Sequence, residues 1–240
     1  MSWEADGGSA YWVITDPRVE NNAILIAEIL VEYDFDTKAI AAALGNAMHE
    51  SSMNPWKWEG STIIATPPTY DYFMNHQGDF NNIGYGIFQY TNPNKYINSN
   101  NSSLPGYSPH FSDVQGTPED GEAQIHFFNN SFSSEWTNSQ LGWYSADFMS
   151  VYGIDTQQYD ISTTDFMSAN VTGNTDEDIV EFLTGAFELC YERPTQQRAV
   201  NTYQMRVDDA LFFYDIIKNI SGRSKFNLMY YLKPWWKGRI

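Results

Sequence analysis

One glutamate in this sequence stands where a side chain can transfer a proton. Glu50 falls in ALGNAMHESSMNPW (residues 43–56), where an apolar helical pattern gives way to serine, asparagine and proline. On a helix Glu50 stacks over Ala47 and Ala43, at the edge of the apolar stripe. Because apolar surroundings disfavour the charged form, we expect Glu50 to hold its proton more tightly than a solvated glutamate. Such an acid can protonate the leaving oxygen of a glycosidic bond. The alternative is a glutamate in a solvated last turn of the helix.

Other kinds of chemistry find little support in the sequence. The single cysteine, Cys190, lies in the apolar run FLTGAFELCY and is interpreted as a small buried hydrophobe. The histidines have no zinc-ligand spacing, and no glycine-rich phosphate loop is present. We therefore expect neither a metal nor a cofactor. The histidines are His49, His76, His110 and His126.

Composition and charge set further bounds. The chain has 240 residues, 42% of them hydrophobic and 16% aromatic, which is enough for one large domain or two small ones. Residues 1–215 carry all 30 acidic residues and 7 basic ones, which argues against nucleic acid as a partner. Residues 216–240 carry 6 basic residues and no acidic one. The N-terminus shows no basic flank with an apolar run, so we expect no signal peptide.

The elements that must position Glu50 are helical. Apolar spacing predicts helices over residues 19–33 and 37–51, the second with Asp36 as its N-cap. Short helices are predicted within residues 121–132, 133–144 and 162–170. A further helix begins after a capping box made by Thr175 and Asp178, and a long one runs from residue 195 to Gly222. Residues 57–82 and 92–121 are polar and appear as irregular loops.

Several motifs together resemble a known family. LGNAMHESSMNP (44–55) followed by GYGIFQYT (84–91) is similar to the lysozyme-like family of phage tail peptidoglycan hydrolases. NPNKYI (92–97), YERP (191–194) with a downstream QRAVNTY, and NNAILIAEILVEYDFDTKAI (21–40) continue the resemblance. The similarity covers roughly residues 20 to 215.

The resemblance implies roles for individual residues. It makes Glu50 the general acid, and it makes the 84–90 segment the lining of a sugar cleft, where Gly84 and Gly86 allow close approach of backbone to glycan. Gln89 would bind substrate or support the glutamate. The implied substrate-binding residues are Ser51, Tyr85, Gly86, Gln89 and Tyr90. The alternative is that residues 83–91 form an ordinary buried hairpin.

This chain also departs from the family pattern. The family glutamate after the long loop corresponds here to Asn129. Asp113, Asp120 and Glu122 are candidates for a second carboxylate, and the sequence does not choose among them. Glu192 and Arg193 of YERP are interpreted as a structural ion-pair network that braces the catalytic helix.

The sequence therefore predicts a mostly α, lysozyme-like α+β fold, a helical domain with a small β and loop region forming a glycan cleft. The predicted domains are residues 1–218, a peptidoglycan hydrolase, and 219–240, a basic aromatic tail. We expect a phage tail lysin that cleaves the glycan backbone of peptidoglycan from outside the cell wall, with other tail proteins as partners. The alternatives are an inactive wall-binding or structural tail protein, a membrane-active tail component, and a bacterial wall-remodelling enzyme.

The C-terminal segment raises a separate question. Residues 226–240 combine aromatic and aliphatic side chains with basic ones, a composition suited to anionic lipid or wall polymer. Packing on the acidic body or docking into a tail assembly are the alternatives, and we rank these above membrane contact.

Overall fold

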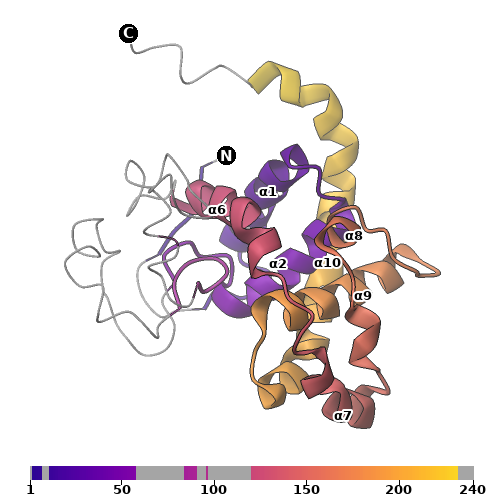
Figure 1. Cartoon of the computed structure of the whole chain (residues 1–240). Coiled ribbons are helices and arrows are strands. Elements are labelled where there is room, and N and C mark those ends of the chain that lie inside the picture. Colours follow the sequence, from indigo (N-terminus) through magenta and orange to yellow (C-terminus); the bar gives the residue numbers. More distant parts are fainter. Residues whose placement is uncertain (1, 7–10, 58–83, 91–95, 97–119, 232–240) are drawn as a thin grey trace.

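The computed structural model describes residues 2–6, 11–57, 84–90, 96 and 120–231, with side chains as far as residue 218 (Figure 1). The described part is mostly helical and contains no β-strand, so the predicted helical character is confirmed. The loop region expected to complete a glycan cleft falls mainly on residues outside this part. The helices are α1 (Pro17–Glu32), α2 (Thr37–Ser51), α6 (Asp120–Glu135), α7 (Leu141–Tyr152), α8 (Thr163–Met167), α9 (Asp176–Phe187) and α10 (Gln196–Tyr231), with a 3₁₀ turn at Thr156–Tyr159 and a π-helical turn, η4, at Glu188–Glu192.

The predicted helix starts are confirmed by their caps. The side chain of Asp36 accepts a hydrogen bond from Lys38 N at 2.9 Å and begins α2. Thr175 and Asp178 form the capping box of α9. Each cap satisfies amide groups that the first turn of a helix leaves without partners. These local signals fix where the two central helices begin.

Helix α2 lies at the centre of the molecule and is buried on almost all sides. Residues 39–44, AIAAAL, are all fully buried, because α1, α9 and α10 pack around the helix. A helix that is apolar all round is typical of a core position. The sequence predicts a single apolar face, whereas the structure surrounds the helix.

Helix α10 crosses α2 in close contact. A Cβ atom added to Gly45 would lie 2.5 Å from the carbonyl oxygen of Arg206. The absence of a side chain at this position therefore lets the two backbones touch. Because the two helices cross here, Arg198 and Arg206 of α10 lie beside the end of α2 that contains Glu50.

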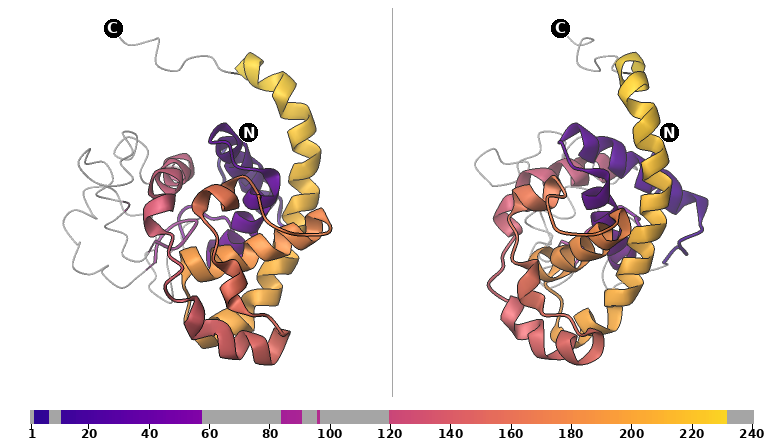
Figure 2. Two further views of the ribbon diagram at one scale, coloured as in Figure 1. Left: turned by 45° about the vertical axis from the view of Figure 1, so that its right-hand side comes forward. Right: turned by 90° about the vertical axis from the view of Figure 1, so that its right-hand side faces the viewer.

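Beyond this crossing, α10 runs further than the sequence predicts. The helix continues past Gly222 to Tyr231, and in both views of Figure 2 its last turns extend beyond the other helices. The predicted end at Gly222 is wrong. A glycine within a helix costs only about 1 kcal/mol relative to alanine, which does not by itself end the helix. Among the described residues, none of the helices has the length and apolar character to cross a membrane.

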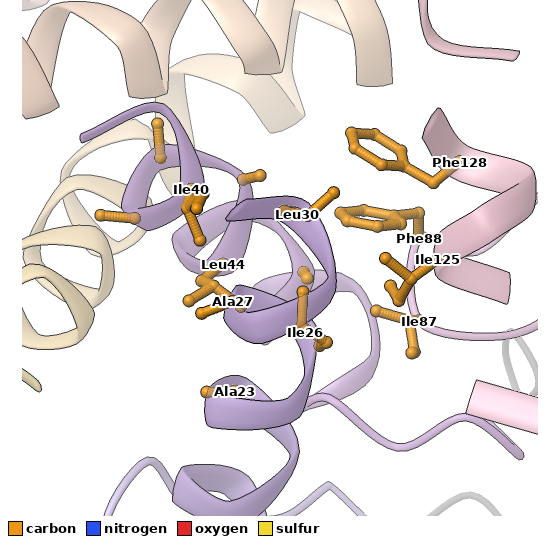
Figure 3. Packing of buried hydrophobic residues seen from close by; sticks show 14 of the residues in the cluster. Ala23, Ile26, Ala27, Leu30, Ile40, Leu44, Ile87, Phe88, Ile125 and Phe128 are labelled. Atoms are coloured by element: carbon orange, nitrogen blue, oxygen red, sulfur yellow. The ribbon is translucent and has the colours of Figure 1, made fainter. Parts of the chain in front are cut away.

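Two hydrophobic clusters hold the helices together. The larger includes α1, α2, α6 and the segment 84–90, and Figure 3 shows Ile87 and Phe88 beside α1 and α6. Phe88 stacks on Phe128 with ring centroids 4.5 Å apart. The smaller cluster joins α7 to α9, η4 and the first half of α10, and it contains the buried Cys190, as predicted. The described residues 84–90 thus form a packed turn, and the alternative hairpin over residues 83–91 extends beyond the described part of the chain.

Candidate active site

Glu50 lies at the C-terminal end of α2, where the chain reverses sharply. Ser52 and Met53 both have left-handed backbone conformations, with φ of 55° and 63°. Non-glycine residues adopt this region only when their surroundings hold them there, and such residues cluster at functional sites. The reversal leaves Glu50 only 7% exposed.

Both carboxylate oxygens of Glu50 accept hydrogen bonds from arginines of α10. Arg206 Nη2 lies 2.5 Å from Oε1, and Arg198 Nη2 lies 2.9 Å from Oε2. Arg206 is fully buried, whereas the side chain of Arg198 is 44% exposed. The sequence places the Glu50 carboxyl beside apolar surface, and the structure adds two cations in contact with its oxygens. The two cations come from residues far along the chain, and the local pattern does not reveal them.

Arg206 connects Glu50 to a second buried carboxyl. Its Nε lies 3.1 Å from Glu188 Oε1 in an ion pair and donates to Thr202 Oγ1 at 3.1 Å, and its Nη1 donates to Asn46 Oδ1 at 2.8 Å. Thr202 also donates to Glu188 Oε1, at 2.9 Å. Burial raises the pKa of Glu188 to about 7, against the opposing attraction of Arg206. The ends of α2 and α9 and the middle of α10 thus share one buried polar cluster.

His49 beside Glu50 is not a second proton donor near neutral pH. Burial, together with the positive charge of Arg206, lowers the pKa of His49 to about 4. The imidazole is therefore neutral over the physiological range.

The segment 84–90 is tied to the end of α2 by side chains. Ser51 Oγ donates to the carbonyl of Ile87 at 2.7 Å, and Gln124 Oε1 accepts from Ile87 N at 2.8 Å. A Cβ atom at Gly86, whose φ is 86°, would lie 2.3 Å from Gln124 Oε1. Gly86 therefore allows close approach of its backbone to the Gln124 side chain, whereas the sequence predicts close approach to glycan.

Gln89 uses its amide within the turn. Its Nε2 donates to the carbonyls of Lys57 at 3.0 Å and Gly86 at 2.8 Å. Gln89 is itself left-handed, with φ of 47°. Ser51 and Gln89 therefore hold the turn in shape, and substrate binding by either stays a prediction.

The two tyrosines of the turn are buried against the protein. Tyr85 is fully buried, and its hydroxyl donates to Asp120 Oδ2 at 2.7 Å. Tyr90 is 8% exposed, and its hydroxyl donates to the carbonyl of Gln124 at 3.2 Å. Substrate binding by these two tyrosines remains a prediction and requires their rings to be uncovered.

The three predicted second carboxylates have different environments. Asp120 is fully buried and accepts hydrogen bonds from the hydroxyls of Tyr85 and Tyr96. Burial raises its pKa to about 6, although those hydroxyls oppose the shift. Glu122 is 56% exposed and lies 3.8 Å from His126. Asp113 lies outside the described residues.

A pocket opens beside the 84–90 turn, and it contains carboxylates that sequence reasoning did not place in the site. Glu135 ends α6, six residues after Asn129, and Glu192 ends η4. The pocket has about 490 Å³ of empty space. It is lined by Phe88, Gln89, Tyr90, Phe127, Ser131, Glu135, Tyr191, Glu192 and Arg193.

Strained backbone brings Glu192 to this pocket. It is the last residue of a π-helical turn, a feature frequent at functional sites, and Arg193 after it is left-handed with φ of 52°. Arg193 pairs with Glu135 at 3.3 Å. The predicted ion-pair network at YERP is thus present for Arg193, but its partner is Glu135.

Comparison with protein-family models identifies the chain. The model of the phage tail lysozyme family matches residues 21–217. The chain belongs to the phage tail lysozyme family. None of the curated proteins compared with it matches significantly.

For a phage tail lysozyme, the matched region covers every helix that contributes to the site. It includes Glu50, the 84–90 turn, Glu192 and both arginines, and it ends before the predicted basic tail. Membership indicates a lysozyme-like peptidoglycan hydrolase, with glycosidase activity in general and association with the virion. The described residues contain no group of three or more His, Cys, Asp or Glu side chains arranged to hold a metal ion.

Proposed function

We propose that this chain cleaves the glycan backbone of bacterial peptidoglycan, with Glu50 as the general acid, as a tail-associated lysin that opens the cell wall during infection. The observation that carries the proposal is the position of Glu50. It is an almost buried carboxyl at the end of a core helix, and its neighbour Ser51 is bonded to the turn that lines the pocket. A lysozyme-like cleft for the glycan is part of this proposal.

Both oxygens of Glu50 are occupied by arginines, so one arginine must move away before Glu50 can contact a substrate. Arg198 is a half-exposed partner, and exposed ion pairs contribute only about 0–1 kcal/mol, so a sugar chain can displace it at small cost. Arg206 is buried, and removing one partner of a buried pair costs about 3–5 kcal/mol. We infer that substrate frees Oε2 from Arg198 while Arg206 continues to hold and orient Oε1.

The chemistry expected is hydrolysis of the glycosidic bond. The leaving oxygen takes a proton as the bond breaks, and a water molecule attacks the anomeric carbon, leaving a reducing end. If Glu50 acts without a second carboxylate, the substrate's own hydroxyl can attack instead and leave an anhydro-sugar end. We favour hydrolysis, because carboxyl groups other than Glu50 line the neighbouring pocket.

Mass spectrometry of fragments from purified peptidoglycan tests the proposal. We expect shortened glycans with reducing ends. Anhydro-sugar ends as the main product would contradict hydrolysis. Fragments cut only within the peptides would contradict the glycosidase assignment itself.

A second candidate is supported by the same contacts. An arginine on each oxygen of Glu50 also suits an ion-pair network that only fastens α10 to α2. The chain would then bind wall glycan without cutting it. Pelleting of the protein with insoluble peptidoglycan, with no release of soluble fragments, would support this candidate.

Contact with other tail proteins through the C-terminal segment is also a proposal. The side chains of residues 219–240 lie outside the described part of the chain. Deletion of residues 223–240 is expected to leave an enzyme that cuts purified peptidoglycan but assembles poorly. A truncated protein that assembles normally but loses binding to anionic vesicles would favour membrane contact instead.

A further inference from the structure

Glu192 lines the pocket with a carboxyl group whose hydrogen bonding is incomplete. Its Oε1 atom is buried and has no hydrogen-bond partner among the described residues. The neighbouring Arg193 donates to Glu135, and so is directed to another carboxylate. A buried carboxyl oxygen without a partner is costly if the group is charged, and the cost is smaller if the group carries a proton.

The charges around Glu192 balance only if one carboxyl group is neutral, and that group is either Glu188, whose pKa burial raises to about 7, or Glu192. The cluster contains three carboxyl groups, Glu50, Glu188 and Glu192, and two guanidinium groups. Each guanidinium contacts Glu50, and the buried one also contacts Glu188. Glu192 has no cation left to it within this cluster.

The electrostatic surroundings agree with the geometry. Burial raises the pKa of Glu192 well above its usual value, and the negative charge of Glu50 raises it further. Arg206 and Arg198 lower it and offset only part of the shift. Other groups around Glu192 in the pocket are the ion pair of Arg193 with Glu135 and the un-ionised Tyr90 and Tyr191.

We propose that Glu192 is the second carboxyl of the active site and that Glu50 and Glu192 together carry one proton. This proposal rests on the glycosidase function proposed above. A carboxylic acid beside a carboxylate is the combination that cleavage of a glycosidic bond uses. Neither Asp120, enclosed by tyrosines, nor the solvated Glu122 offers a comparable partner for Glu50.

The proton balance of the reaction follows. As the bond between the anomeric carbon and the leaving oxygen breaks, its electron pair goes to that oxygen, which takes the proton of the pair. The attacking water bonds to the anomeric carbon and returns one proton to the pair. The enzyme therefore ends with the single proton with which it began, and the two groups titrate as a unit.

Kinetics on purified peptidoglycan test the role of Glu192. Glu192→Gln is expected to lower kcat by about 10²-fold or more with little change in KM, and to move the alkaline limb of the pH–rate profile. Glu192→Asp keeps a carboxyl and should restore that limb with partial activity. Glu181→Gln, at an exposed position of α9 outside the pocket, is the control and should match the wild type. An unchanged pH profile in Glu192→Gln, or activity within a few-fold of the wild type, would overturn the proposal.

A titration without substrate separates this proposal from the proposed function. In protein with ¹³C-labelled glutamate carboxyl groups, NMR should show a carboxyl protonated at neutral pH whose signal disappears in Glu192→Gln. Glu188→Gln distinguishes the signal of the other buried glutamate. If the wild type cuts no glycan, the glycosidase function fails whatever the titration shows. If Glu50 and Glu192 are both ionised at neutral pH, the shared proton is refuted even in an active enzyme.

Discussion

Two buried carboxyl clusters are linked to the 84–90 turn, and they are built from different groups. At the end of α2, Glu50 is contacted by two guanidinium cations. At the start of α6, Asp120 is contacted by neutral donors, the hydroxyls of Tyr85 and Tyr96 and the amide of Gln124. Among the neutral donors, burial still raises the pKa of Asp120 to about 6. The first cluster therefore has the composition of a reaction centre, and the second that of an anchor.

The largest effect expected within the first cluster is on stability. Arg206→Met should lower the free energy of unfolding by about 3–5 kcal/mol, because it leaves buried carboxylates without their cation. Arg198→Met should cost at most about 1 kcal/mol, because that pair is half exposed. Denaturant unfolding of both variants measures the difference. Equal losses of unfolding free energy in the two variants would contradict the inference that Arg206 is fixed and Arg198 is displaceable.

The pH dependence of stability distinguishes the two clusters. The pKa of Asp120 is about 6 in the folded protein against an ordinary 3.8, so the folded state binds more protons between these values. The free energy of unfolding should therefore fall as pH rises through this window, by on the order of 1–3 kcal/mol from this group. Glu188 should act in the same direction between 4.5 and about 7.

Substitution of each carboxyl group tests whether it causes the loss of stability in its own pH range. Asp120→Asn should flatten the lower window, and Glu188→Gln the upper one, when unfolding is measured from pH 4 to pH 8. The slope is the quantity to compare, since each substitution also changes hydrogen bonds. A variant that keeps the wild-type slope in its own window would show that its carboxyl group is not the origin of that slope.

The smallest effect concerns the anchor. Tyr85→Phe removes one hydrogen bond to Asp120 and should lower the free energy of unfolding by about 0.5–1.5 kcal/mol. Its KM for peptidoglycan should stay close to that of the wild type, because the hydroxyl is buried. A raised KM with unchanged stability would instead support the role in substrate binding that the sequence predicts for Tyr85.

The sequence predicts those features that depend on neighbouring residues. The cap at Asp36 and the capping box at Thr175 fix helix starts through contacts within one turn, and both are confirmed. The mostly helical fold follows from apolar periodicity in the same way. The end of α10 is missed because a glycine such as Gly222 is only a weak helix breaker.

The environment of Glu50 could not be predicted because its partners are distant in the chain. Arg198 and Arg206 lie 148 and 156 residues after it. The sequence indicates a structural role for Glu192 because YERP contains its own arginine, but that arginine donates to Glu135. Pairing of this kind depends on how α2, η4 and α10 cross, and a linear pattern does not record the crossing.

Release of new reducing ends from purified peptidoglycan by Glu50→Gln tests the central claim most directly. The assay compares this variant with the wild type at equal concentrations of folded protein, since the substitution also weakens the contact with Arg206. We predict a rate about 10²–10⁴-fold lower, because the substitution removes the proton donor and keeps the size of the side chain. A folded Glu50→Gln protein that releases reducing ends at the wild-type rate would contradict the assignment of Glu50 as the general acid.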